Sequence, residues 1–123
     1  MAKKILIVDD SQSVRTIARI ALRERGYDVL EAANGQEALD KLRASERVHL
    51  VISDVNMPKM DGINFLKEVK RDPTYKFTPV IMLTTEAGQD MKERGRAAGA
   101  KAWITKPFQP QFLVDAVAKL VLA

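Results

Sequence analysis

The chain has 123 residues, of which 46% are hydrophobic and 29% charged, and a formal net charge of +4. These values are ordinary for a globular protein, and the length suits one domain, residues 1–123. The lack of cysteine excludes disulfides and thiolate metal sites, and the single histidine, His49, excludes a histidine-based zinc site. No apolar stretch is long enough for a signal-peptide core or a membrane span, so we expect a cytoplasmic protein.

Strands and helices are predicted to alternate along the whole chain. Short runs rich in Val, Ile and Leu indicate the strands, and apolar residues at helical spacing indicate the helices. Gly26 is expected to end the first helix. In chain order, the predicted elements are a strand at 5–8, a helix capped by Ser11 or Ser13, a strand at 27–32, a helix at 35–45, a strand beginning at 50, a helix at 63–71, a strand at 79–83, a helix at 90–98, a strand at 102–105 and a final helix around 112–120.

The first helix carries a basic stripe beside its apolar one. Arg15, Arg19 and Arg23 repeat at i, i+4 and i+8. We favour a solvated helix face; a docking stripe for an acidic partner is an alternative, and a nucleic-acid patch is less favoured because no aromatic residues interleave with the basic ones. The residues expected to face the core are Val14, Ile17, Ala18, Ala21 and Leu22 in the first helix and Phe112, Leu113, Ala116, Val117 and Leu120 in the last.

The stretch at 48–62 joins a core strand to a polar turn. Residues 50–52 are Leu-Val-Ile without polar alternation, which is typical of a strand buried on both faces. Polarity changes at Ser53 and Asp54, and proline and glycine follow as turn signals. Asp54 is therefore predicted at the carboxyl end of a core strand, the edge at which open α/β sheets bind ligands. An aspartate that merely starts a turn is the alternative.

Five strand-then-helix units with short connections predict an α/β fold in which helices cover both faces of an all-parallel sheet. The carboxyl ends of parallel strands meet at one edge. This topology brings together Asp9 and Asp10 after the first strand, Asp54 after the third, Thr84 after the fourth and Lys106 after the fifth. The meeting of these side chains follows from the fold class, because no sequence spacing requires it.

Three carboxylates in close contact repel one another, so either some are protonated or a cation lies among them. Carboxylate, carbonyl and water ligands suit a hard ion such as Mg²⁺. A lysine and a hydroxyl beside that ion form a site for a phosphoryl group, because the cations neutralise its oxygens and the hydroxyl donates a hydrogen bond.

Four motifs in the chain are specific in combination: Asp9-Asp10 after ILIV, Asp54 in ISDVNMPKMDG, Thr84 in IMLTT, and Lys106-Pro107-Phe108. With them, the whole chain resembles the receiver domain of two-component response regulators, and in particular the stand-alone chemotaxis CheY type. The resemblance implies a single doubly wound (βα)5 flavodoxin-like domain with a five-stranded parallel sheet in the order 2-1-3-4-5.

The resemblance also implies roles for the acidic edge. Asp54 is then the phosphoacceptor, which attacks the phosphorus of a kinase phosphohistidine and becomes an acyl phosphate. Asp54 is also a metal ligand, Asp10 binds Mg²⁺ directly, and Asp9 does so mainly through water. The backbone carbonyl of Asn56 completes the protein ligands.

Lys106 and Thr84 are the implied partners of the phosphoryl group, with a cis peptide expected between Lys106 and Pro107. In the family, Thr84 closes on the phosphoryl group and an aromatic residue three positions before the lysine swings inward, which couples the site to a distant surface. That residue is Trp103 here, larger than the Tyr or Phe of many relatives. An aromatic that covers the sheet edge and does not move is the alternative.

The implied output surface comprises the fourth helix, the last strand and the last helix. The fourth helix is weakly patterned, so we expect it to be the least stable helix. Asn56 and Glu86, two residues after Asp54 and Thr84, occupy positions that tune phosphoryl lifetime in the family. Two exposed polar residues without a kinetic role are the alternative.

The resemblance implies protein partners and no external substrate. We expect a sensor histidine kinase, a flagellar motor switch protein or another effector, and a possible phosphatase. A phosphorelay intermediate or a phosphate sink is the alternative to a motor effector. We expect a monomer that binds neither nucleic acid nor membrane and is not an enzyme in its own right.

Other functions fit the chain less well. A phosphatase acting on an external substrate would need a cap domain or a substrate pocket, and Asp54 is not followed by an acid two residues on. A flavodoxin-like cofactor binder needs a phosphate loop after the first strand, where Asp9 and Asp10 would repel the phosphate. A DNA-binding regulator is disfavoured because no output segment is seen after the last helix.

Overall fold

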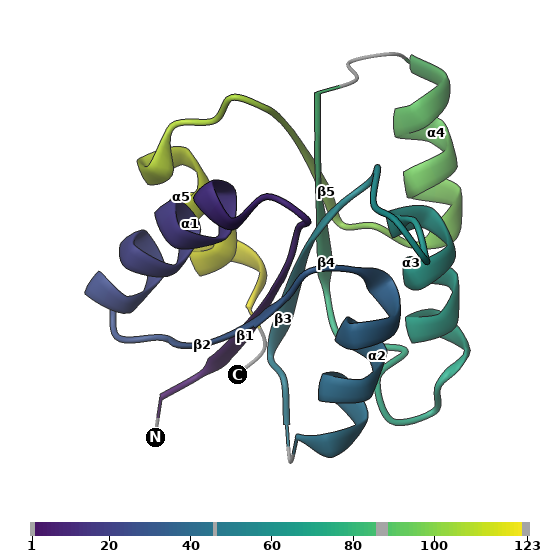
Figure 1. Cartoon of the computed structure of the whole chain (residues 1–123), viewed down its shortest axis with the longest axis horizontal. Helices are drawn as coiled ribbons and strands as arrows, with labels where there is room; N and C mark the ends of the chain where they lie inside the picture. Colours follow the sequence, from purple (N-terminus) through teal and green to yellow (C-terminus); the bar gives the residue numbers. More distant parts are fainter. Residues whose placement is uncertain (1, 46, 86–88, 122–123) are drawn as a thin grey trace.

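The structure is a computed structural model that describes residues 2–45, 47–85 and 89–121, with five strands and five helices in alternation (Figure 1). All ten predicted elements are present, with ends within one or two residues of the predictions. They are β1 (Lys4–Val8), α1 (Gln12–Glu24), β2 (Asp28–Ala32), α2 (Gly35–Ala44), β3 (Leu50–Asp54), α3 (Gly62–Arg71), β4 (Val80–Thr84), α4 (Gln89–Ala98), β5 (Ala102–Thr105) and α5 (Pro110–Leu120).

The strands form one parallel sheet in the order β2-β1-β3-β4-β5. The register aligns Val8 at the end of β1 with Ala32 of β2 and Ser53 of β3, and it aligns Asp54 with Leu83 of β4. The carboxyl ends of neighbouring strands therefore lie at the same edge. The predicted flavodoxin-like α/β class, parallel sheet and strand order are confirmed.

Helices cover both faces of the sheet: α1 and α5 lie on one face, and α2, α3 and α4 lie on the other (Figure 1). Successive side chains of a strand point to opposite faces. Ile5 and Ile7 of β1 therefore pack into the core under α1 and α5, whereas Leu6 and Val8 pack into the core under α2 and α3. Burial on both faces explains why β1, β3 and β4 contain continuous apolar runs, whereas the edge strand β2 carries Asp28 and Glu31 and is less buried.

Among the helix starts that the structure describes, those of α1, α2 and α3 have side-chain caps. Ser11, Asn34 and Asp61 each accept a hydrogen bond from the backbone N–H three residues ahead, which satisfies an otherwise unpaired donor at the helix start. Ser11, rather than Ser13, is the cap of α1. Gly26 follows α1 with a φ of 86°, a left-handed conformation that glycine adopts without a steric penalty.

Two residues predicted to face the core are exposed instead: Ile17 is 48% exposed and Phe112 is 59% exposed. The buried stripes of the two helices are narrower than the apolar periodicity suggested. In α1 only Ala18 and Leu22 are fully buried, and in α5 the buried residues are Leu113, Val114 and Val117. Each helix packs on the sheet through a narrow stripe, so an apolar residue at the edge of that stripe remains in contact with solvent.

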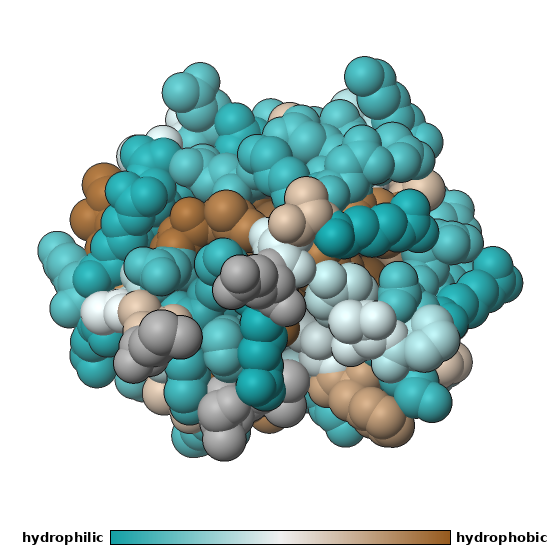
Figure 2. Space-filling view, turned by 90° about the horizontal axis from the view of Figure 1, so that it is seen from below, coloured by the Kyte–Doolittle hydropathy of each residue, from teal (hydrophilic) through white to brown (hydrophobic). Residues whose placement is uncertain are grey.

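Figure 2 shows the molecule from below the view of Figure 1. Hydrophilic residues cover most of this face, and hydrophobic residues appear between them in separate areas. Within the part of the chain that the structure describes, no helix is both long and apolar enough to cross a membrane.

Candidate functional site

Three carboxylates meet at the carboxyl edge of the sheet. Asp9 and Asp10 follow β1, Asp54 ends β3, and one oxygen of each lies within 4.8 Å of the others. Asp9 and Asp54 are buried, whereas Asp10 is exposed. The structure therefore brings together the three predicted acids, and a group of carboxylate oxygens of this kind could hold a hard divalent cation.

Lys106 neutralises part of this negative charge. Its Nζ lies 2.7 Å from Oδ2 of Asp9 and 3.3 Å from Oδ1 of Asp54, and the lysine side chain is only 13% exposed. The backbone of Lys106 is placed by β4, because its N–H donates to the carbonyl of Thr84 at 2.7 Å. The expected cis peptide between Lys106 and Pro107 is confirmed.

The pKa values of the two charged partners are shifted in the same direction. Burial, and then the negative charge of Asp9, raises the pKa of the Asp54 carboxyl above 3.8, although Lys106 opposes the rise. Burial alone would lower the pKa of Lys106, but the hydrogen bond and charge of Asp9, together with those of Asp54, outweigh it and raise the pKa above 10.5. Lys106 is therefore a permanent cation at neutral pH. The ionised form of the neighbouring Asp54 carboxylate would be stabilised by any further positive charge.

Backbone contacts fix the position of Asp54. The Val55 N–H donates to Oδ1 of Asp54 at 2.8 Å. Gly62, at the start of α3, packs directly on the backbone of Asp54, since a Cβ at position 62 would lie 2.0 Å from the Asp54 carbonyl oxygen. In the sequence, Gly62 was interpreted only as a turn signal, and this packing role was not predicted. The Asp61-Gly62 pair at a helix start, shortly after the acidic residue, was the available signal.

Thr84 and Asn56 differ in burial. Thr84 is buried at the end of β4, beside the backbone of Lys106. Asn56 is exposed in the loop that follows β3. Glu86 lies outside the described residues, so the roles predicted for it and for the other two residues stay predictions.

Trp103 lies on the face of β5 that is covered by α4. A Cβ at Gly95 of α4 would lie 2.2 Å from Cζ3 of Trp103, so the indole ring occupies the space that the missing side chain leaves. The ring packs against the core under α2 and α3, and its buried Nε1 has no hydrogen-bond partner in the described part of the chain. Gly95 thus accommodates an aromatic residue larger than tyrosine at this position.

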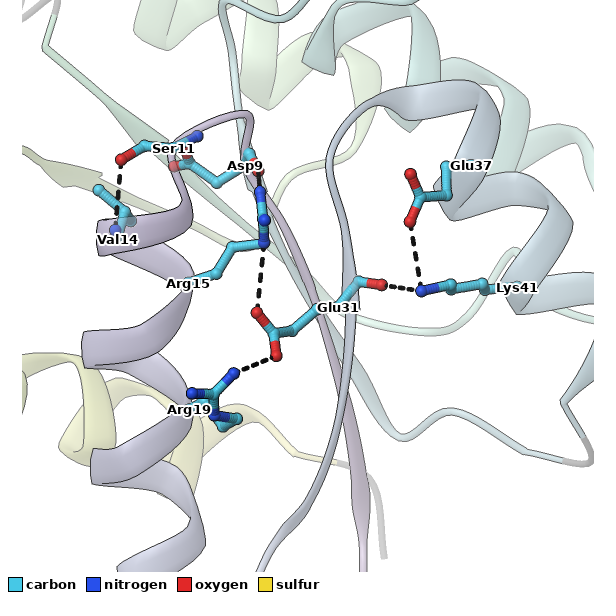
Figure 3. Close-up of polar contacts among 8 residues, drawn as sticks. All are labelled: Asp9, Ser11, Val14, Arg15, Arg19, Glu31, Glu37 and Lys41. Carbon is cyan, nitrogen blue, oxygen red and sulfur yellow. Dashed lines mark hydrogen bonds and ion pairs between the residues drawn. The ribbon is translucent and has the colours of Figure 1, made fainter.

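The basic stripe of α1 is not a solvated face at Arg15 and Arg19. Both guanidinium groups pair with Glu31 of β2, with N–O distances of 3.2 and 2.5 Å (Figure 3). Arg15 also donates from Nη1 to the carbonyl of Asp9 at 2.6 Å. The solvated-face interpretation is wrong for these two residues, because helical spacing does not reveal which neighbouring element packs against a face. Arg23 is exposed, as expected.

Comparisons with known sequences agree with this geometry. Residues 5–118 match the family described as response regulator receiver domain. The chain is 44% identical over 113 residues to the chemotaxis protein CheY1 of Helicobacter pylori, which covers 91% of each chain. It is 39% identical to the alkaline phosphatase synthesis transcriptional regulatory protein PhoP of Bacillus subtilis, over 99% of this chain and 49% of that protein.

A comparison with solved structures leads to the same family. The chemotaxis protein CheY4 of Vibrio cholerae has a TM-score of 0.93 to this structure and 44% sequence identity, with 98% of this chain and 99% of that chain covered. The match extends over the whole sheet and both helical layers, and the acidic edge lies where the family motifs predicted it. The chain therefore belongs to the response regulator receiver domain family and is a receiver domain of the two-component type.

Proposed function

We propose that this chain is a phosphorylation-controlled switch that acts in chemotaxis, in which a histidine kinase transfers a phosphoryl group to Asp54 with the help of Mg²⁺. The observation that carries the proposal is the contact of Lys106 with both Asp9 and Asp54, at an edge where three carboxylates lie within 4.8 Å. Similarity to two proteins named as chemotaxis proteins, CheY1 and CheY4, supports the chemotaxis setting.

Asp54 acts as the nucleophile in the proposed transfer. One of its carboxylate oxygens forms a bond to phosphorus while the bond between phosphorus and the kinase imidazole nitrogen breaks, and the electron pair stays on that nitrogen. Bound Mg²⁺ supplies positive charge for the phosphoryl oxygens. Asp10, Asp54 and the backbone carbonyl of Asn56 would hold it, and Asp9 would act through water. Lys106 already faces Asp54, and it would pair with the phosphoryl oxygens after transfer.

Thr84 and Trp103 carry the signal to the surface formed by α4, β5 and α5. The Thr84 hydroxyl is attracted to the phosphoryl oxygens, and Trp103 follows into the space that Thr84 leaves. The packing of Trp103 on Gly95 supports this route, because α4 contacts the ring at Gly95 and a shift of the ring would change that contact. The proposed effector is a flagellar motor switch protein, with a relay or phosphate-sink role as the alternative. The chain acts on itself and turns over no external substrate.

The first test is phosphorylation of the Asp54→Asn variant. Acetyl phosphate and Mg²⁺ should add a phosphoryl group to the wild type and none to the variant, as measured by intact-mass spectrometry, with circular dichroism confirming an unchanged fold. Asp115→Asn, which changes an exposed acid on α5, is the matched control and should be phosphorylated normally. Stable labelling of another residue in Asp54→Asn would contradict the assignment.

The second test concerns the partner. Bait protein with Mg²⁺ and beryllofluoride, which stands in for the phosphoryl group, should capture a flagellar switch component from native lysate, whereas Asp54→Asn should not.

Lys106→Ala should still be phosphorylated and yet lose the partner response. Capture of kinase or phosphotransfer proteins alone would favour the relay or sink role. Rapid turnover of a small phosphorylated molecule without a persistent phosphoprotein would overturn the switch proposal.

A further inference from the structure

Arg15 connects the acidic edge to β2. It lies near the start of α1 with a side chain that is 16% exposed, and its guanidinium group makes two directed contacts. Nη1 donates to the carbonyl oxygen of Asp9 at 2.6 Å, and Nε donates to Oε1 of Glu31 at 3.2 Å (Figure 3). One planar cation therefore spans the gap between the backbone of the acidic loop and a strand carboxylate.

Glu31 is itself held in place from two other directions. Its second carboxylate oxygen accepts a hydrogen bond from Nη1 of Arg19 at 2.5 Å, and its backbone carbonyl accepts one from Nζ of Lys41 (Figure 3). Burial raises the pKa of the Glu31 carboxyl, but the hydrogen bonds and charges of Arg19 and Arg15 outweigh burial and lower it. Glu31 is therefore a fixed anion at neutral pH, and it fixes the orientation of Arg15.

The carbonyl that Arg15 binds belongs to the peptide group between Asp9 and Asp10. The rest of Asp9 is fixed separately, since its N–H donates to the carbonyl of Ala32 at 3.0 Å and its Oδ1 accepts from the Ser11 N–H at 2.9 Å. The Arg15 contact restricts rotation of the following peptide group, and this group determines where the exposed Asp10 carboxylate points. Asp10 is one of the three acids whose oxygens lie within 4.8 Å.

We infer that Arg15, supported by Glu31, is a positioning residue that holds the Asp9–Asp10 peptide in the orientation needed to bind a divalent cation. The inference rests on the proposed function, because it takes Asp9, Asp10 and Asp54 as the Mg²⁺ site. This role requires no contact of Arg15 with the metal or the phosphoryl group, because its contacts are with Glu31 and the Asp9 carbonyl. It acts by removing a backbone rotation that would otherwise have to be restricted when the cation binds.

The Coulomb interaction and the positioning role predict opposite results for the Arg15→Gln variant. Removal of a positive charge near a divalent cation should tighten Mg²⁺ binding if charge alone matters. Loss of positioning should weaken it by about tenfold, as is typical for residues that orient metal ligands. Arg19→Gln is the matched control, because Arg19 lies on the same helix and binds the same Glu31 but has no contact with Asp9. It should bind Mg²⁺ as tightly as the wild type or slightly more tightly.

The experiment is a calorimetric Mg²⁺ titration of the wild type, Arg15→Gln, Arg19→Gln and Arg15→Lys at constant ionic strength. Arg15→Lys keeps a donor for the Asp9 carbonyl and should recover part of the lost affinity. Urea unfolding with and without Mg²⁺ excludes a merely structural role, which would lower stability equally in both buffers. A tenfold weaker site instead reduces the stabilisation by saturating Mg²⁺ by about 1.4 kcal/mol.

The outcomes separate this inference from the function on which it rests. The positioning role would be overturned if Arg15→Gln bound Mg²⁺ as tightly as the wild type. It would also be overturned if Arg15→Gln and Arg19→Gln lost Mg²⁺ affinity equally. Neither result would bear on the proposed phosphorylation of Asp54. Failure of the wild type to bind Mg²⁺ would overturn the metal site, and the positioning role with it. Weakened binding in Arg15→Gln alone, with partial recovery in Arg15→Lys, supports the inference.

Discussion

The two sides of the acidic edge are built differently. On the side of α1 and β2, charged hydrogen bonds from Arg15 connect Asp9 to Glu31, and each group has more than one partner. On the side of α4 and β5, the ring of Trp103 rests on Gly95, and its buried Nε1 has no partner among the described residues. The first side is held by directional bonds, whereas the second is held by packing of an aromatic ring.

The helices α3 and α4 cover the same face of the sheet and differ in how much they bury. Burial is described for residues 92–98 of α4, and among these only Gly95 is buried. The neighbouring helix α3 buries Gly62, Ile63, Phe65, Leu66 and Val69. Residues 92–98 therefore bury little apolar surface, which lowers the free-energy cost of local opening in this part of α4. That α4 is the least stable helix stays a prediction. We expect the acids to be held more firmly than the side of α4 and β5, and four substitutions test this comparison.

Gly62→Ala should have the largest effect on stability, because the new Cβ would collide with the Asp54 carbonyl oxygen. We expect a loss of about 3 kcal/mol in the free energy of unfolding, at the upper end for an overpacked position. Urea unfolding measures it. Gly26→Ala is the control: no atom lies within 4 Å of its new Cβ, so only the left-handed backbone penalises it, by about 1 kcal/mol. A smaller loss for Gly62→Ala than for Gly26→Ala would contradict the steric argument.

Lys106→Ala should rank second, because it leaves the fully buried carboxylate of Asp9 without its cation. We expect a loss of about 2 kcal/mol at pH 7 in Mg²⁺-free buffer, less than for a completely buried pair. The loss should shrink when Mg²⁺ is added, since the metal replaces the missing positive charge. Lys119→Ala, on the exposed face of α5, should change stability by less than about 0.5 kcal/mol. A loss unaffected by Mg²⁺ would indicate that lysine and metal do not share these carboxylates.

Gly95→Ala tests the aromatic packing between α4 and β5. The new methyl group should displace the Trp103 ring and destabilise the protein by about 1 kcal/mol. In a Trp103→Ala background the sign should reverse, because the ring is absent and alanine favours the helix by about 1 kcal/mol over glycine. The fluorescence of the single tryptophan should shift to longer wavelength in Gly95→Ala. An equal effect in both backgrounds would show that Gly95 and Trp103 are not coupled.

The smallest expected effect is the pH dependence that Asp54 contributes. Its pKa is raised in the folded protein, so the folded state binds more protons than the unfolded state between pH 3.8 and the raised pKa. Stability from this group therefore falls as pH rises through that window. Asp54→Asn should be slightly more stable than the wild type at pH 7 without Mg²⁺, and the difference should shrink as pH falls toward 3.8. Urea unfolding midpoints across that pH range measure this difference in stability. A difference between Asp54→Asn and the wild type that grows as pH falls would contradict the predicted direction.

Much of the fold and of the acidic cluster could be predicted because the signals are local. Continuous Val, Ile and Leu runs indicate strands that are buried on both faces, and parallel topology then requires that Asp9, Asp54 and Lys106 meet at one edge. The width of the buried helical stripes could not be predicted in the same way. Ile17 and Phe112 have the right spacing for the core and yet lie in solvent, because packing against neighbours decides where a stripe ends.

The sequence by itself determined the alternation of strands and helices, the α/β class and the set of polar residues at the carboxyl edge. Only the tertiary structure revealed that Gly62 packs on Asp54, that Gly95 makes room for Trp103, and that Arg15 connects Asp9 to Glu31. Each of these contacts joins different structural elements. Local periodicity identifies which side of an element is buried, whereas the register between elements arises from close packing of the whole core.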